Sequence, residues 1–196
     1  MIKEEGKLKK IILGKLNSNR ETVDRFLGYK SRKMPAIINK KIEEEMELIG
    51  KYLDMEMEYK VFKEDSNFYA FIIYTVGGRV EELLDHYTNN TETIRALIID
   101  KLSIVVLDSI KEFAIEEIEK ETGLYVIKES YPGSKNFPIG KQKVILESMD
   151  NIEAIKINDY YQLFPVKSVA LKVDLSKEIK EYDRCQDCEN PCEINK

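Results

Sequence analysis

The sequence contains no tryptophan, one histidine and three cysteines among its 196 residues. A mechanism based on histidine would therefore have only His86 to use. The cysteines are odd in number and all lie near the C-terminus, which argues against a disulfide framework and favours the cytoplasm. The formal net charge of -5 leaves no sustained basic stripe, so nucleic acid is a poor candidate partner.

Long hydrophobic runs are also missing. The longest apolar runs, such as the one at 104–107, fall far short of the roughly 18 residues that a membrane span needs. The N-terminal segment has a short apolar centre and no small-residue cleavage site, so we expect no signal peptide. The lysine-rich stretch at 7–15 is interpreted as a solvated helix face. We therefore expect no membrane partner.

The composition that remains is that of a globular protein, with 43% hydrophobic and 34% charged residues. The chain length suits one domain with a small appendage. We predict one folded domain over 1–182 and a cysteine-containing tail over 183–196.

Apolar residues at helical spacing predict several helices. Asn19 is a good N-cap and Gly28 a good stop for a short helix between them. A long helix over 91–123, capped by Thr91 or Thr93, is predicted to be the central buried helix. Its apolar face has six members: Ile94, Ile98, Leu102, Val105, Ile110 and Phe113. Three further helices are predicted at 35–53, 77–90 and 139–149.

Strands are predicted by alternating or continuous apolar patterns. The segments 55–64 and 67–76 favour a hairpin, and the second is apolar enough for a central strand. Further strands are predicted at 123–129, 154–159 and 167–175. Because helices and strands do not alternate strictly, we predict an α+β fold with a mixed, largely antiparallel sheet packed with helices.

Two polar features have both a structural and a functional interpretation. Gly77 and Gly78 precede a helix, where free N–H groups could bind an anion, but the pattern matches no phosphate-binding motif and favours a tight turn. On the long helix, Asp100 with Ser103 and Asp108 with Lys111 are spaced to meet. Such residues are more often the wet edge of a helix than catalytic groups.

The segment 128–140 reads KESYPGSKNFPIG and carries two turn signals, Pro132-Gly133 and Asn136-Phe137-Pro138. Proline stiffens the path, and Gly133 permits a positive φ or the close approach of a ligand. Two rigid corners around a short stretch would present backbone groups outward on a preorganised shelf, which lowers the entropic cost of binding.

The tail carries Cys185, Cys188 and Cys192 within CQDCENPC. A C-x2-C pair with a third nearby thiolate provides three of the four ligands of a tetrahedral metal site. The spacing is not that of a familiar zinc finger or of the common iron–sulfur runs. Zinc or an iron–sulfur cluster is one interpretation; a reduced tail or a redox-active pair is the other.

Several motifs taken together resemble the activation (reactivation) domain of cobalamin-dependent methionine synthase in its stand-alone form. The Pro-Gly segment YPGSKNFPIGKQKVIL is similar to the Pro-Gly stretch of that family, and NDYYQLFPVKSVALKVDL to its later Pro-x-x-Ser-Val segment. Three upstream segments also resemble it: NRETVDRFLGYK, IIYTVGGRVEELL and LIIDKLSIVVLDSIKE.

The resemblance implies a C-shaped α+β domain that binds S-adenosylmethionine. It would assist the reductive remethylation of a corrinoid (cobalamin) protein or methyltransferase, with a flavodoxin-like electron donor. The implied ligand residues are Glu129, Tyr131, Pro132, Gly133, Ser134 and Asn136.

Two positions depart from the family pattern, because an Arg and a Tyr of the family fall on Glu129 and Ser134. A glutamate at 129 is expected to repel the carboxylate of the ligand. Binding of S-adenosylmethionine stays the first interpretation, and two alternatives to it are kept. One is a non-catalytic interaction subunit of a corrinoid methyltransferase system that has lost this ligand, and the other is a metal or redox module centred on the cysteines.

Overall fold

The computed structural model describes residues 5–29 and 33–180. The three cysteines of the tail, and with them the predicted metal site and the predicted boundary at 182, lie outside the described residues. Within the described ranges, no helix is both long and apolar enough to cross a membrane.

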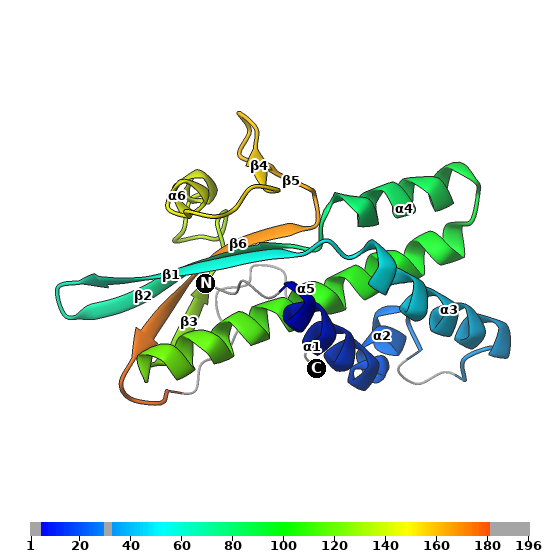
Figure 1. Cartoon of the computed structure of the whole chain (residues 1–196), viewed down its shortest axis with the longest axis horizontal. Helices are drawn as coiled ribbons and strands as arrows, with labels where there is room; N and C mark the ends of the chain where they lie inside the picture. Colours follow the sequence, from blue (N-terminus) through cyan, green and yellow to red (C-terminus); the bar gives the residue numbers. More distant parts are fainter. Residues whose placement is uncertain (1–4, 30–32, 181–196) are drawn as a thin grey trace.

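The centre of the fold is an antiparallel sheet with the strand order β1-β2-β6-β3 (Figure 1). The strands are β1 (Glu56–Glu64), β2 (Asn67–Thr75), β3 (Tyr125–Ser130) and β6 (Ser168–Ser176). The predicted hairpin is confirmed, since β1 pairs with β2 from Glu56 opposite Thr75 to Glu64 opposite Asn67. The prediction of a central strand is also confirmed, because β2 pairs with β6 on its other side.

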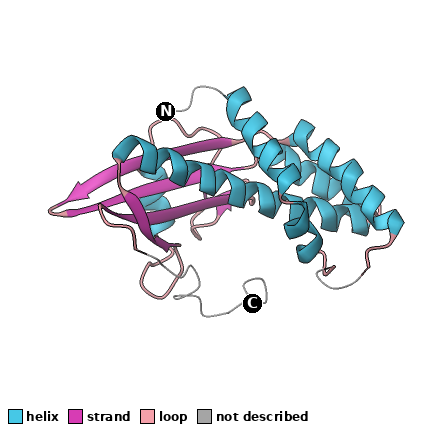
Figure 2. Ribbon diagram, turned by 90° about the horizontal axis from the view of Figure 1, so that it is seen from below, coloured by secondary structure: helices cyan, strands magenta, loops and turns pink. Residues whose placement is uncertain are grey.

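The long helix α5 (Thr93–Thr122) crosses one face of this sheet (Figures 1 and 2). Four other helices pack around α5: α1 (Glu5–Ser18), α2 (Arg20–Phe26), α3 (Ala36–Tyr52) and α4 (Gly78–Asn89). The long helix α5 is the predicted central helix, and it buries residues along most of its length. Side chains of alternate β2 residues, Ala70, Ile72 and Tyr74, join the same core.

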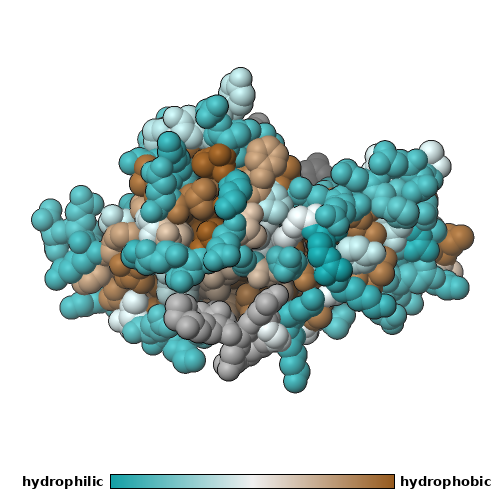
Figure 3. Space-filling model, turned by 45° about the horizontal axis from the view of Figure 1, so that its top comes forward, coloured by the Kyte–Doolittle hydropathy of each residue, from teal (hydrophilic) through white to brown (hydrophobic). Residues whose placement is uncertain are grey.

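The opposite face of the sheet carries a thinner layer, which consists of α6 (Lys141–Glu147) and a small hairpin of β4 (Lys156–Ile157) and β5 (Leu163–Phe164). Its core contains Phe71 and Ile73 of β2 together with Ile145 and Leu163. Because β2 is covered on both faces, its sequence is continuously apolar and does not alternate. Figure 3 shows apolar side chains among hydrophilic ones on this side of the molecule.

Acidic residues of the edge strand β1 hold the connection that follows α6. Glu58 accepts hydrogen bonds from two backbone N–H groups at 150–151, at 3.2 and 2.8 Å. Glu56 does the same for two N–H groups at 153–154, at 3.0 and 2.9 Å. The thin layer is thus fixed to the sheet by carboxylate–backbone contacts as well as by its apolar core.

A buried carboxylate connects three helices. Glu45 of α3 is fully buried; it accepts a hydrogen bond from Tyr87 of α4 at 2.9 Å and pairs with Arg95 of α5. Arg95 also contacts Glu44 at 2.7 Å and Glu92 at 3.2 Å. Burial and the hydrogen bond to Glu45 raise the pKa of Tyr87 to about 12. The charge of Glu45 is therefore paired within the helical layer, as a buried charge requires.

Three details of the sequence-based predictions are wrong. The lysine-rich segment at 7–15 is not simply a solvated face, because Leu8 and Ile12 of α1 are buried in the core. Ile94 was expected on the buried face of α5 but is 49% exposed. The N-cap of α5 is Glu92 and not a threonine, and it makes no side-chain capping hydrogen bond.

The glycine turn before α4 has a structural cause. Gly77 has a φ of +91°, and a Cβ atom there would lie 2.3 Å from the backbone oxygen of Asp54. The chain leaves β2 here and passes directly against the link between α3 and β1, where Asp54 donates to the carbonyl of Val76 at 3.1 Å. Any side chain at 77 would force two backbone segments apart.

We expect Gly77→Ala to lower the free energy of unfolding by more than about 2 kcal/mol, since it combines a positive φ with a backbone clash. Gly78→Ala is the matched control, because its Cβ would meet only Pro165 Cγ at 3.8 Å. That control should change stability by less than about 0.5 kcal/mol. Urea unfolding measures both substitutions. Equal effects would contradict the explanation that the backbone of Asp54 leaves no room for a side chain at 77.

Candidate functional site

The loop after β3 is a closed turn held by its own backbone hydrogen bonds. Gly133 N–H donates to Phe137 O at 2.7 Å, and Phe137 N–H donates to Ser134 O at 3.0 Å. Ser134 N–H donates to Tyr131 O, also at 3.0 Å. Gly133 has a φ of +95°, so the predicted need for glycine is confirmed. However, these three N–H groups serve the loop itself, and the prediction that they are presented outward is wrong for them.

Glu129, the residue before this loop, points inward toward α5. Its side chain is only 3% exposed, and its carboxylate lies 3.3 Å from Lys111 Nζ. Tyr131 donates a hydrogen bond to the same oxygen, Glu129 Oε2, at 2.6 Å. Lys111, itself 7% exposed, also lies 3.5 Å from Asp108. The predicted contact between Asp108 and Lys111 is therefore confirmed, and the side chains of Glu129 and Tyr131 join the same cluster.

The electrostatics of this cluster follow from burial among acidic groups. Burial, followed by repulsion from Glu129 and the hydrogen bond to it, raises the pKa of Tyr131 far above its ordinary value. Burial, with Asp108 and Glu129 nearby, raises the pKa of Tyr74 as well. Both phenols therefore stay protonated, and Tyr131 remains a hydrogen-bond donor to Glu129 at all physiological pH values.

The expected repulsion between Glu129 and a bound carboxylate needs correction. The Glu129 charge is directed into the protein and is compensated by Lys111, so it does not face solvent as an isolated negative charge. Lys128 lies opposite Asp174 in the register, on the other face of the strand, and is exposed. Lys128 and Glu129 therefore point to opposite faces of the sheet, as consecutive residues of a strand do.

The remaining predicted ligand residues are partly or fully accessible. Pro132 and Ser134 are half-buried, whereas Gly133 and Asn136 are exposed. The Tyr131 side chain presents part of its surface to solvent, with 38% of the residue exposed, while its hydroxyl points to Glu129. The loop thus offers an aromatic side chain, a turn and an amide to solvent, all held by an ordered backbone.

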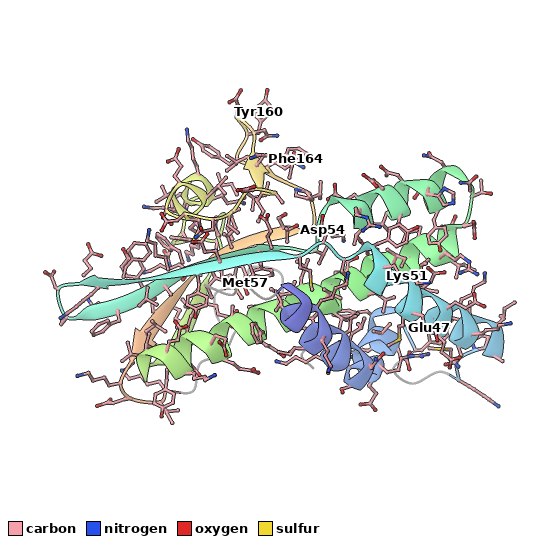
Figure 4. The ribbon with its side chains drawn as sticks, viewed as in Figure 1. Glu47, Lys51, Asp54, Met57, Tyr160 and Phe164 are labelled. Atoms are coloured by element: carbon pink, nitrogen blue, oxygen red, sulfur yellow. The ribbon has the colours of Figure 1, made fainter. Side chains whose placement is uncertain are left out.

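An aromatic hairpin stands beside the loop and was missed by sequence reasoning. Its residues 158–162 form a tight turn, in which the Asn158 side chain accepts hydrogen bonds from two backbone N–H groups at 3.0 and 2.9 Å. Tyr161 packs on Gly140, where a Cβ would lie 3.5 Å from its ring. Tyr160 is 88% exposed, and Figure 4 shows it at the outer end of the hairpin, with Phe164 nearer the sheet. The sequence signal was Tyr-Tyr within a turn, after Asn158-Asp159.

The second predicted polar pair of α5 is Asp100 with Ser103, nearer the start of the helix, and these two side chains do not interact with each other as expected. Ser103 is buried and donates to the carbonyl of Ile99 at 2.7 Å, not to Asp100. Asp100 instead accepts hydrogen bonds from Lys167 at 2.5 Å and Lys101 at 2.9 Å. Burial alone would raise the pKa of Asp100, but the hydrogen bonds from these two lysines outweigh it and lower the pKa.

Metal ligands do not gather in the described part of the chain. Within 5–29 and 33–180, no group of three His, Cys, Asp or Glu side chains is placed to hold an ion. His86 is exposed on α4 and lies beside Asn90, with 3.3 Å between the ring and the amide nitrogen.

Comparisons with known proteins give a match in structure and none in sequence. The sequence matches no family model and no curated protein. The fold is similar to that in the crystal structure of the MetH reactivation domain bound to AdoHcy, with a TM-score of 0.64 and 11% sequence identity. The match covers 85% of this chain and 78% of the other. The predicted α+β fold is confirmed, and so is the resemblance to the reactivation domain at the level of the fold.

We expect Asp100→Asn to lower the free energy of unfolding at neutral pH by about 1 kcal/mol, because the ion pair with Lys167 is only partly shielded from water. The folded-state pKa of Asp100 lies below its ordinary value of 3.8, so its contribution is present above that pH and is lost as the pH falls through the folded-state pKa. The difference between wild type and variant should therefore be full at pH 7 and shrink below about pH 4.

Urea unfolding at several pH values measures this difference, and Asp85→Asn, which changes an exposed acid on α4, is the control. A difference that stays constant down to pH 2 would show that Asp100 acts through something other than its charge.

Proposed function

We propose that this protein binds S-adenosylmethionine at the loop 129–137 and assists the reductive remethylation of a corrinoid protein. The observation that supports the proposal is the fold match over 85% of the chain to a reactivation domain that was crystallised with AdoHcy. The proposed ligand residues are Glu129, Tyr131, Pro132, Gly133, Ser134 and Asn136. The partners would be a cobalamin-binding protein or methyltransferase and a flavodoxin-like electron donor, in the cytoplasm.

The chemistry needs positioning rather than an acid or a base from this chain. The cobalamin of the partner, reduced by one electron from the donor, would supply the nucleophile for this transfer. S-adenosylmethionine would supply the methyl group and would leave as AdoHcy, which keeps the electron pair of the broken carbon–sulfur bond. The protein has to hold the sulfonium in line with the cobalt and exclude competing acceptors, and a preorganised turn suits that task.

Individual residues have different parts in this proposal. Glu129 supports the site from inside, because its carboxylate is buried against Lys111 and accepts the Tyr131 hydroxyl. Tyr131 would contact the ligand through the exposed part of its side chain, and Asn136 would supply amide hydrogen bonds. Gly133 keeps the turn closed.

A second candidate function is an interaction subunit of a corrinoid methyltransferase system that does not bind S-adenosylmethionine. Two observations favour it: the inward orientation of Glu129, and the use of three loop N–H groups within the loop. A zinc or iron–sulfur site at Cys185, Cys188 and Cys192 stays a prediction for residues outside the described ranges. Metal analysis of anaerobically purified protein tests it.

Isothermal titration calorimetry of the full chain with S-adenosylmethionine and with AdoHcy tests the first proposal. We expect a Kd in or below the millimolar range. Gly133→Ala should weaken binding about tenfold, because it strains a positive-φ position inside the proposed site. Gly28→Ala is the matched control, since Gly28 also has a positive φ, +83°, and nothing lies within 4 Å of its Cβ position.

If neither S-adenosylmethionine nor AdoHcy gives a heat of binding, the proposed ligand is wrong, and the interaction subunit is the candidate function that is left. Equal weakening by Gly133→Ala and Gly28→Ala would place the ligand elsewhere. Binding to a purified corrinoid protein, with no affinity for either ligand, would support the second candidate function directly.

A further inference from the structure

The buried cluster under the candidate loop has an architecture that loop closure alone does not require. Lys111 of α5 lies 3.3 Å from the carboxylate of Glu129, and Tyr131 reaches the same carboxylate oxygen at 2.6 Å. Three elements therefore meet at one oxygen: the central helix, the end of the edge strand and the start of the loop. Both partners of the ion pair are almost completely removed from solvent, with 7% and 3% of their side chains exposed.

An irregularity in β3 directs Glu129 toward this lysine. Val126 faces the helical core and pairs with Leu175, and regular alternation from there would turn residue 128 inward and residue 129 outward. The register shifts between Val126 and Lys128, so that Glu129 pairs with Val173, which also faces the helical core. A β-bulge re-aims side chains in this way, and here it places the acid and not the lysine of β3 against α5.

A second contact fixes the other end of the same strand to the same helix. The backbone N–H of Val126 donates to Glu119 Oε1 at 2.9 Å. Lys111 and Glu119 are eight residues apart on α5, which is slightly more than two turns and puts both on one side of the helix. Among the described strands, β3 pairs with β6 alone, and contacts with α5 hold β3 on both sides of its bulge.

Stability is a poor explanation for this ion pair. Burying two charges costs desolvation energy that their attraction barely repays, and apolar side chains of similar volume often stabilise a protein as well or better. A buried, hydrogen-bonded ion pair defines a geometry, because any arrangement that separates the two charges leaves each of them buried without a partner. Tyr131 takes its position from that geometry, since its hydroxyl ends on Glu129.

We infer that Lys111 is a positioning residue for the candidate ligand loop, which acts through Glu129 to hold Tyr131 and the turn that follows it. Lys111 itself lies beneath the loop and does not contact the ligand. The inference concerns the same site as the proposed function and rests on it for its ligand-binding consequence. The ordering of the loop, however, can be measured without any ligand.

The experiment compares hydrogen–deuterium exchange of the purified full chain, followed by mass spectrometry, in five proteins. They are the wild type, Lys111→Met, Lys111→Arg, the apolar pair Lys111→Met with Glu129→Leu, and the control Lys101→Met. Lys101 is also on α5 and loses an ion pair, with Asp100 at 2.9 Å, but it lies ten residues, or about 15 Å, along the helix from Lys111. Melting temperatures and calorimetry with AdoHcy complete the set.

We expect peptides covering 130–137 to exchange about tenfold faster in Lys111→Met, because losing the anchor lowers the local cost of opening. The apolar pair should show the same acceleration although its melting temperature stays close to that of the wild type. Lys111→Arg should restore slow exchange, and Lys101→Met should leave the loop unchanged. Affinity for AdoHcy should fall in parallel with the faster exchange.

Unchanged exchange at 130–137 in the apolar pair, which remains readable even where Lys111→Met folds poorly, would overturn the inference. An acceleration spread equally over β2 and the loop would also overturn it, because that result indicates a general loss of stability. If the wild-type protein does not bind AdoHcy, that result counts against the proposed function alone. The exchange rates at 130–137 still decide whether Lys111 orders the loop.

Discussion

The rest of the structure depends on the burial of α5 between the sheet and the other helices. Twelve of its residues are buried, and they lie along the helix from Ile98 to Ile118. The sheet supplies alternate residues of β2 and β6 to this core, while α1, α3 and α4 pack against other sides of α5. A helix that is apolar over so much of its surface is stable only when surrounded, so its sequence alone demands a layer on each side.

That arrangement makes the two faces of the sheet unequal. One face carries a thick helical layer whose charges are paired inside it, as for Glu45 with Arg95. In the described part of the chain, the other face carries α6 and the β4–β5 hairpin, and the core between them and the sheet consists of six buried residues. The thick layer contains most of the buried core. The thin layer and the loop at its edge present the exposed aromatic side chains, which is the usual division between scaffold and binding residues.

Sequence periodicity predicted the sheet strands, the central helix and the α+β class, because those elements follow from which residues must be buried. Periodicity gave wrong or incomplete predictions where the placement of a side chain depends on a residue that is distant in the sequence. The many lysines of α1 led to the prediction of a solvated helix face, although Leu8 and Ile12 between them are buried. The bulge before Lys128 depends on the register with β6, and the partner of Glu129 is eighteen residues away on another element. Local patterns contain neither fact, and the two-residue strands of the aromatic hairpin are too short to show any period.

The fold is similar to that of the reactivation domain at 11% identity, although Glu129 stands where the family resemblance leads us to expect an arginine. Core positions accept many apolar side chains provided that volume and pattern are kept, so the sheet and α5 tolerate extensive substitution. A residue at the loop, in contrast, acts through its charge and its direction. An acid directed outward there would repel an anion; the same acid, turned inward by a bulge and paired with Lys111, supports the loop from below. The effect of this charge on the candidate site thus depends on the direction of the side chain, which the register of its strand sets.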